Sequence, residues 1–200
     1  MSAPGSARLF VALDLPAEVR GALVAWTREQ AGGVARLRLV GPASLHVTLC
    51  FLGTRPTAEV GEIAAACRAA VSGLPAPALV IGGALWLPPK RPRVLTVTLA
   101  DDGGRLTAVQ SALARALVAG GFYEPEPRPF LAHVTVARVQ RDGRARGVEL
   151  PAPEPASFSA EQVTLYRSRL GGGPARYEAL AGVSLCSEPH ETSESAEPNH

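Results

Sequence analysis

The chain has 200 residues, a formal net charge of +2 and an apolar fraction of 46%, which suits one globular domain or two small lobes that share a core. Its longest apolar stretch, residues 78–87, contains two glycines and is far shorter than the roughly 18–20 residues that span a bilayer. The apolar run at residues 10–13 is too short for a signal peptide. We therefore expect a cytoplasmic protein that does not enter membranes.

Eight segments have the apolar runs and β-branched composition that predict strands. They are residues 7–13, 37–40, 45–52, 79–87, 94–99, 130–139, 163–166 and 177–185. Glycine and proline predict turns at residues 101–104 and 171–174, and the polar residues 141–155 predict a mobile loop.

Three segments have apolar residues at helical spacing, namely residues 17–31, 58–72 and 106–119. Pro16 suits the first turn of the first helix, and Thr57 is the predicted N-cap of the second. The order of these elements predicts an α+β fold with two similar lobes and mostly antiparallel sheets. We expect residues 1–185 to form this single bilobal domain and residues 186–200 to form a disordered tail.

Charge is divided unevenly along the chain. Residues 186–200 contain four glutamates and no Lys or Arg, which leaves 20 basic and 14 acidic residues, a formal charge of +6, on residues 1–185. Nineteen of the basic residues are Arg, whose guanidinium group suits phosphate. An anionic partner is one interpretation of this excess. A codon bias that also explains the abundant Ala, Gly and Pro is an equally good one.

One short phrase occurs twice: residues 46–49 read His-Val-Thr-Leu and residues 133–136 read His-Val-Thr-Val. The chain has four histidines, and the other two lie in the polar tail. Because side chains alternate along a strand, each phrase presents its His and Thr on one face, roughly 6.5–7 Å apart, and its aliphatic residues on the other. Two such strands across a cleft would place two His and two Thr around one space.

This set of side chains suits the cleavage of a phosphodiester. The reaction needs a base on the entering oxygen and an acid on the leaving oxygen, and His46 and His133 can each serve as either near neutral pH. The hydroxyls of Thr48 and Thr135 can donate to the phosphoryl oxygens. Arg138 can hold phosphate charge, provided that a bulge or twist turns it onto the His133 face, because strict alternation would place it on the opposite face.

Two other sites compete with this interpretation. Two histidines without a Cys pair and without carboxylates on the same strand faces make a poor zinc site, so we expect no metal. Cys50 is predicted to share the face of His46 and Thr48, which makes a thiol nucleophile conceivable, although a small side chain that lines the site is the favoured interpretation. The three cysteines form no disulfide framework, and we expect reduced thiols.

The paired phrases resemble those of the 2H phosphoesterases, and within them the RNA 2′,3′-cyclic phosphodiesterases of the LigT/ThpR type, historically called 2′-5′ RNA ligases. The resemblance covers residues 7–185. Segments that carry it are residues 8–16, 45–53, 128–130, 137–138, 164–168 and 175–177. Ala132 departs from the proline that is common before the second His.

The resemblance implies a bilobal 2H phosphoesterase fold with an active-site groove between the lobes. It implies hydrolysis of RNA 2′,3′-cyclic phosphate ends to 2′-phosphomonoesters, without a cofactor. It assigns proton donation to His46 and proton abstraction to His133, and it gives phosphate binding to Thr48, Thr135 and Arg138. The residues alone do not separate acid from base.

Phe51 is a candidate for the nucleoside site, and a core position explains it at least as well. The expected partner is RNA with 2′,3′-cyclic phosphate ends, with tRNA fragments and small nucleotides as candidates, and we expect a monomer. Three alternatives remain open: 2′-5′ RNA ligation, cyclic phosphodiesterase activity on small nucleotides such as cyclic ADP-ribose derivatives, and non-catalytic binding of RNA or nucleotides.

Overall fold

A computed structural model describes residues 5–140, 148–169 and 176–187. Nine strands form one curled sheet, β1 (Ser6–Asp14), β2 (Leu37–Leu39), β3 (His46–Pro56), β4 (Ala78–Leu87), β5 (Val94–Ala100), β6 (His133–Val139), β7 (Ser157–Ser159), β8 (Gln162–Arg169) and β9 (Arg176–Ser184). Three α-helices accompany it, α1 (Ala17–Ala31), α2 (Val60–Val71) and α3 (Arg105–Ala119), with short 3₁₀ turns η1 (Pro42–Ser44) and η2 (Thr57–Glu59). No helix in the described ranges is long and apolar enough to cross a membrane.

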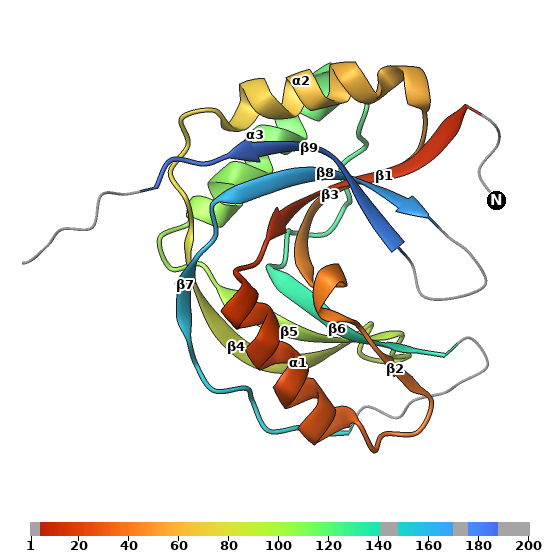
Figure 1. The fold of residues 1–200 in the computed structure, drawn as a ribbon, viewed down its shortest axis with the longest axis vertical. Helices are drawn as coiled ribbons and strands as arrows, with labels where there is room; N and C mark the ends of the chain where they lie inside the picture. The colour runs from red at the N-terminus through yellow and green to blue at the C-terminus, as the bar shows by residue number, and fades with distance from the viewer. Residues whose placement is uncertain (1–4, 141–147, 170–175, 188–200) are drawn as a thin grey trace, which may run out of the picture.

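The sheet has the order β7-β4-β5-β6-β3-β1-β8-β9, and every paired strand is antiparallel to its neighbour. The two histidine strands, β3 and β6, are therefore the central pair. The chain reaches each of them in the same way, because β1–α1 leads to β3 and β5–α3 leads to β6. The sheet thus divides into two similar halves, as the sequence predicted, although both halves belong to one continuous sheet (Figure 1).

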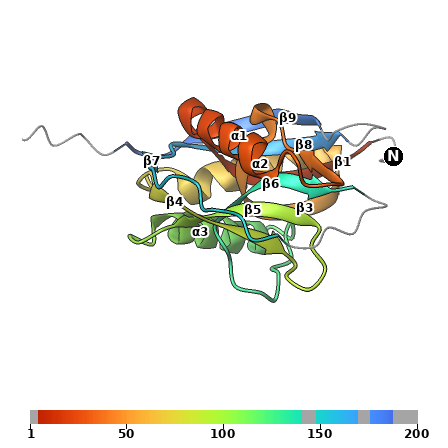
Figure 2. The same cartoon turned by 90° about the horizontal axis from the view of Figure 1, so that it is seen from below.

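Each crossing helix packs against the opposite half. Helix α1 follows β1 and contacts β6, β2 and η1, whereas α3 follows β5 and contacts β3 and α2. Figure 2 shows α1 and α3 on opposite sides of β4 and β5. The predicted spacing of α3 is confirmed, since Leu106, Val109, Leu113 and Leu117 are all buried. Burial of these apolar faces joins the halves into one core.

The two halves meet through a short junction. A single pair, Val47 with Val134, joins β3 to β6, and both side chains are fully buried. Farther along β6, residues Ala137 to Val139 pair with β2 instead of β3. The strands therefore diverge immediately beyond the histidines, which leaves the His and Thr side chains only partly buried.

Three local predictions need comment. Thr57 is not an N-cap: its hydroxyl donates to the Gly5 carbonyl at 3.0 Å, it begins η2, and α2 starts at Val60. A short strand, β7, follows the predicted loop and pairs with β4. Cys186, the first residue of the predicted tail, forms a β-bridge with Pro75. The rest of the tail from residue 188, the 171–174 turn and residues 141–147 lie outside the described residues.

Candidate active site

The central strand pair brings the two repeated phrases together with opposed directions. Because Val47 pairs with Val134 in antiparallel register, one step either way places His46 opposite Thr135 and Thr48 opposite His133. All four side chains lie on the face opposite the buried valines. Each histidine therefore has the hydroxyl of the other phrase as its cross-strand neighbour, and the candidate site is symmetric about the Val47–Val134 pair.

In both histidine strands, the alternation of side chains between the two faces is interrupted three residues after the histidine. In β3, Val11 pairs with Cys50 and Ala12 with Thr48, so Leu49 has no partner on β1. In β6, Leu95 pairs with Ala137 and Thr96 with Thr135, so Val136 has no partner on β5. Each skipped residue is a β-bulge three positions after the histidine. Two consecutive residues are buried at each bulge, Leu49–Cys50 and Val136–Ala137.

The bulges decide which residues join the His/Thr face. A single extra residue reverses the parity of the strand, so Arg138 emerges on the same face as His133 and Thr135. The sequence required a bulge or twist to turn Arg138 onto the His133 face, and the bulge at Val136 provides it. Phe51 occupies the equivalent position on β3 and is 41% exposed, which excludes a core position for this residue. The Arg8 guanidinium lies 4.7 Å from the centre of its ring.

The same shift overturns the prediction for Cys50. Its side chain points into the core and is 1% exposed, not on the face of His46 and Thr48. Burial, with a smaller contribution from Cys67, raises the pKa of the Cys50 thiol to about 12. A protonated, inaccessible thiol is a poor nucleophile, so Cys50 is a core residue.

The His133 ring is held in one tautomer. Its Nδ1 lies 2.8 Å from the carbonyl oxygen of Leu131, and a carbonyl can only accept a hydrogen bond. Nδ1 therefore carries the proton, and in the neutral ring Nε2 has the free lone pair. His46 makes the matching contact, a hydrogen bond to the backbone of Ser44, which also lies two residues upstream. Each ring is thus oriented by a hydrogen bond to the backbone of the residue two positions before the histidine.

His46 lies in an aromatic enclosure that strongly affects its charge. Its ring stacks on Phe10 at 4.9 Å between centroids and meets the edge of Tyr177 at 5.2 Å. Burial lowers the pKa of His46 to about 4, the Ser44 hydrogen bond opposes this shift, and the positive charges of Arg138 and His133 add to it. Arg138 and His133 are therefore close enough to act electrostatically on His46, which is neutral in the free protein at pH 7.

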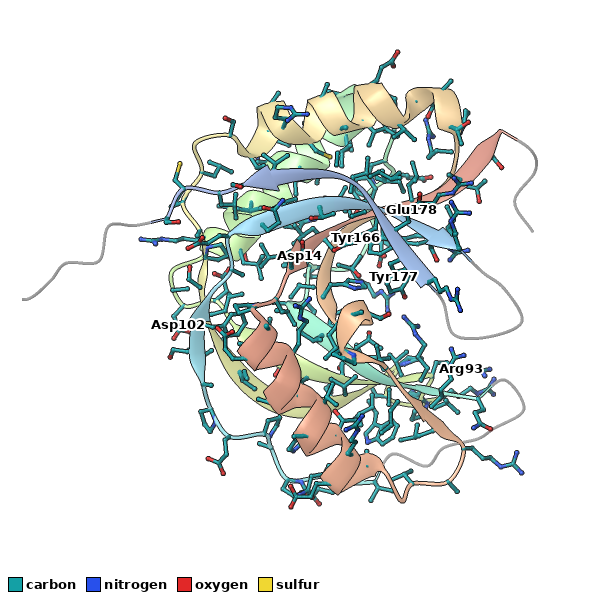
Figure 3. All side chains as sticks on the ribbon, viewed as in Figure 1. Asp14, Arg93, Asp102, Tyr166, Tyr177 and Glu178 are labelled. Carbon is teal, nitrogen blue, oxygen red and sulfur yellow. The ribbon has the colours of Figure 1, made fainter. Side chains whose placement is uncertain are left out.

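A carboxylate network beside this enclosure escaped the sequence reasoning. The Asp14 carboxylate accepts hydrogen bonds from Tyr166 at 2.8 Å and Thr164 at 2.7 Å, and Asp14 pairs with His46 across β1 and β3. Figure 3 shows Asp14, Tyr166 and Tyr177 on the side of the upper strands that faces the lower half of the sheet. Alternation along β1 places Asp14 and Phe10 on one face, but their contacts with β8 and β9 depend on the sheet order.

Within the described residues, no group of three or more His, Cys, Asp and Glu is arranged to hold a metal ion. The site is built instead from two imidazoles, two hydroxyls and a guanidinium. These groups can exchange protons and stabilise negative charge on phosphate oxygens.

Comparison with known proteins agrees with this geometry. Residues 16–172 match the family model described as the 2′-5′ RNA ligase superfamily. The chain belongs to this superfamily. Among its curated members, the RNA 2′,3′-cyclic phosphodiesterase of Escherichia coli is 31% identical over 186 residues, which cover 89% of this chain and 96% of that protein. The Thermus thermophilus protein of the same name is 30% identical, with 90% and 91% covered.

Solved structures in the superfamily share the fold. A crystal structure from Thermus thermophilus matches with a TM-score of 0.76 and 27% identity, and covers 91% of this chain and 100% of that chain. The crystal structure of Escherichia coli LigT complexed with 3′-AMP gives the same score and identity, with 90% and 98% covered. The expected 2H phosphoesterase fold is therefore confirmed for this superfamily member.

The burial of Cys50 in this superfamily member predicts selective thiol chemistry. Iodoacetamide should modify Cys186, which is exposed, and leave the buried Cys50 and Cys67 unmodified in the native protein. Peptide mass spectrometry reads the modified positions, with denatured protein as the control in which all three react. Rapid labelling of Cys50 under native conditions would contradict its assignment to the core.

The lowered pKa of His46 predicts an acid-sensitive contribution to stability. The unfolded chain, with a histidine pKa of about 6.5, binds more protons than the folded chain between pH 6.5 and 4, so the free energy of unfolding should rise with pH across that window. Denaturant unfolding of wild type and His46→Gln should diverge by about 1–3 kcal/mol between pH 7 and 4, with the wild type losing more. Parallel pH curves for the two proteins would contradict a buried, neutral His46.

Proposed function

We propose that this chain hydrolyses RNA 2′,3′-cyclic phosphate ends to 2′-phosphomonoester ends. The observation that carries the proposal is the antiparallel pairing of the two His-Val-Thr phrases, which gathers two imidazoles, two hydroxyls and Arg138 on one face. Four curated relatives named RNA 2′,3′-cyclic phosphodiesterase support the substrate class. The site offers an acid, a base and donors for phosphoryl oxygens without a cofactor.

In the proposed reaction, water attacks phosphorus and the bond from phosphorus to the 3′-oxygen breaks. His133 accepts the proton of the attacking water, and His46 gives a proton to the departing 3′-oxygen. The product has a 2′-phosphate and a free 3′-hydroxyl. Thr48, Thr135 and Arg138 donate to the non-bridging oxygens, where the transition state carries its charge.

The tautomer of His133 supports its role as the base. With Nδ1–H held by the Leu131 carbonyl, the lone pair of the neutral ring is on Nε2, available to accept a proton. The same hydrogen bond stabilises the imidazolium that forms.

The environment of His46 ties its role as the acid to substrate binding. In the free protein, burial holds the pKa of His46 near 4, so the ring lacks the proton that it must donate. A bound phosphodiester anion would offset the charge of Arg138 and raise that pKa. We infer that His46 takes up a proton as the substrate binds.

Substitution of either histidine should reduce turnover of a cyclic-phosphate RNA end by about 10²–10⁴-fold. An aryl phosphodiester separates the two roles, because its phenolate leaves without a proton. On that substrate, His46→Ala should lose much less activity than on RNA, whereas His133→Ala should lose a similar factor on both. Circular dichroism checks that the variants are folded. Near-normal turnover by either variant on RNA would contradict the two-histidine mechanism.

The proposed mechanism uses no metal, so turnover should persist in EDTA. Loss of activity with chelator, followed by recovery with a divalent cation, would overturn this part of the proposal.

Ligation is the second candidate, because the matching family model is described as the 2′-5′ RNA ligase superfamily. A 5′-hydroxyl end would replace water as the nucleophile in the reaction above. An oligonucleotide with a 2′,3′-cyclic phosphate end, incubated with and without a 5′-hydroxyl partner, distinguishes the two by product. A 2′-phosphate end alone favours the hydrolase, and a joined 2′-5′ product favours the ligase. Tight binding with no product in either assay would instead favour a binding module.

A further inference from the structure

Two arginines face each other directly beside the candidate site. Arg38 on β2 pairs with Arg138 on β6, so both side chains leave the same face of the sheet from backbone positions about 4.5–5.5 Å apart. Both residues are exposed, and neither forms an ion pair with another residue in the described part of the chain. The bulge at Val136 places that face on the same side as His133 and Thr135.

The surrounding segments add positive charge. Residues 34–40, 87–99 and 132–140 together contain six basic residues and no carboxylate. Arg93 precedes β5, and its carbonyl accepts a hydrogen bond from the Val139 amide at 2.8 Å, which fixes it beside the end of β6. Figure 3 labels Arg93 at this end of the sheet. Strands β2 and β6 thus present the cations Arg38 and Arg138 on the face of the site, and the basic segment that ends at Arg93 lies beside the end of β6.

Like charges directly opposite each other on neighbouring strands destabilise a sheet. The Arg38–Arg138 pair therefore has a cost that the fold alone does not offset. An anion that contacts both guanidinium groups would remove this repulsion and form charge-assisted hydrogen bonds. Since Arg138 is assigned to the scissile phosphate, Arg38 is free to hold a second one.

We propose that Arg38 binds the phosphodiester on the 5′ side of the terminal nucleotide, and so makes the enzyme favour RNA chains over cyclic mononucleotides. This inference rests on the proposed function. A nucleoside 2′,3′-cyclic phosphate carries only the phosphate that Arg138 takes, whereas any longer chain brings a second phosphate adjacent to it.

The test compares one substrate pair in three proteins. The substrates are 2′,3′-cyclic AMP and a trinucleotide RNA that ends in the same cyclic phosphate. The proteins are wild type, Arg38→Gln and the control Arg115→Gln, which removes an exposed arginine from α3. Arg38→Gln should reduce kcat/KM on the trinucleotide by about tenfold, chiefly through KM, and change the mononucleotide reaction less than about twofold.

Salt dependence gives a second readout. For single strands, each neutralised phosphate contributes a slope of about −0.7 to log K against log salt. The slope of log K against log salt for trinucleotide binding should therefore be shallower in Arg38→Gln than in wild type by about that amount. The slope measured for Arg115→Gln should match that of wild type. Arg38→Lys, which keeps the charge but loses the bidentate geometry, should fall between wild type and Arg38→Gln.

The outcomes separate this inference from the function it rests on. No turnover of either substrate by wild type would overturn the proposed function. Turnover of both substrates, with an equal loss on both in Arg38→Gln, would place Arg38 on the scissile phosphate and overturn the second-phosphate site. Unchanged kinetics and salt slope would give Arg38 no role in binding. The melting temperature of Arg38→Gln should not fall, because the substitution removes a repulsion, and a marked decrease would indicate a structural role instead.

Discussion

Each histidine strand carries a β-bulge three residues after its histidine, and the candidate site depends on these two bulges. The bulges at Leu49 and Val136 lie at the same distance from His46 and His133. Each one buries two consecutive residues and then reverses which face the following side chain occupies. Without the second bulge, Arg138 would direct a guanidinium into an apolar core, which is costly for an unpaired charge. With it, the charge reaches the same face as the two imidazoles and the two hydroxyls.

The electrostatics of the free site favour an anion before any chemistry begins. His46 is desolvated by burial among its aromatic neighbours and lies near the charge of Arg138, so its pKa lies near 4 and the ring is neutral at pH 7. Arg138 and Arg38 lie opposite each other, and neither forms an ion pair with a carboxylate in the described part of the chain. Negatively charged phosphate oxygens would stabilise the protonated form of His46 and would also reduce the repulsion between Arg38 and Arg138. Proton uptake by His46 and binding of the substrate are therefore coupled in the proposed mechanism.

The elements could be predicted where their periodicity was strong. The apolar spacing of α3 and the apolar runs of β1, β3 and β6 correspond to the observed structure because burial produces those patterns. Strand β7 was missed because three residues carry too little pattern. Thr57 and Cys50 were misassigned because each prediction used a local rule that a distant partner overrides. Thr57 donates to Gly5, and pairing with β1 shifts Cys50 into the core.

The sequence by itself determined the chemistry that is available: two His-Val-Thr phrases, a nearby arginine, and strand parity that places each His and Thr on one face. It also indicated two similar halves, because one phrase falls in each. Only the tertiary structure decided that the phrases lie on adjacent antiparallel strands, that Phe51 and Arg138 join their face and Cys50 leaves it, and that Phe10, Tyr166 and Tyr177 enclose His46. The physical reason is that bulges, strand order and desolvation arise from pairing between segments far apart in the chain, which no local pattern encodes.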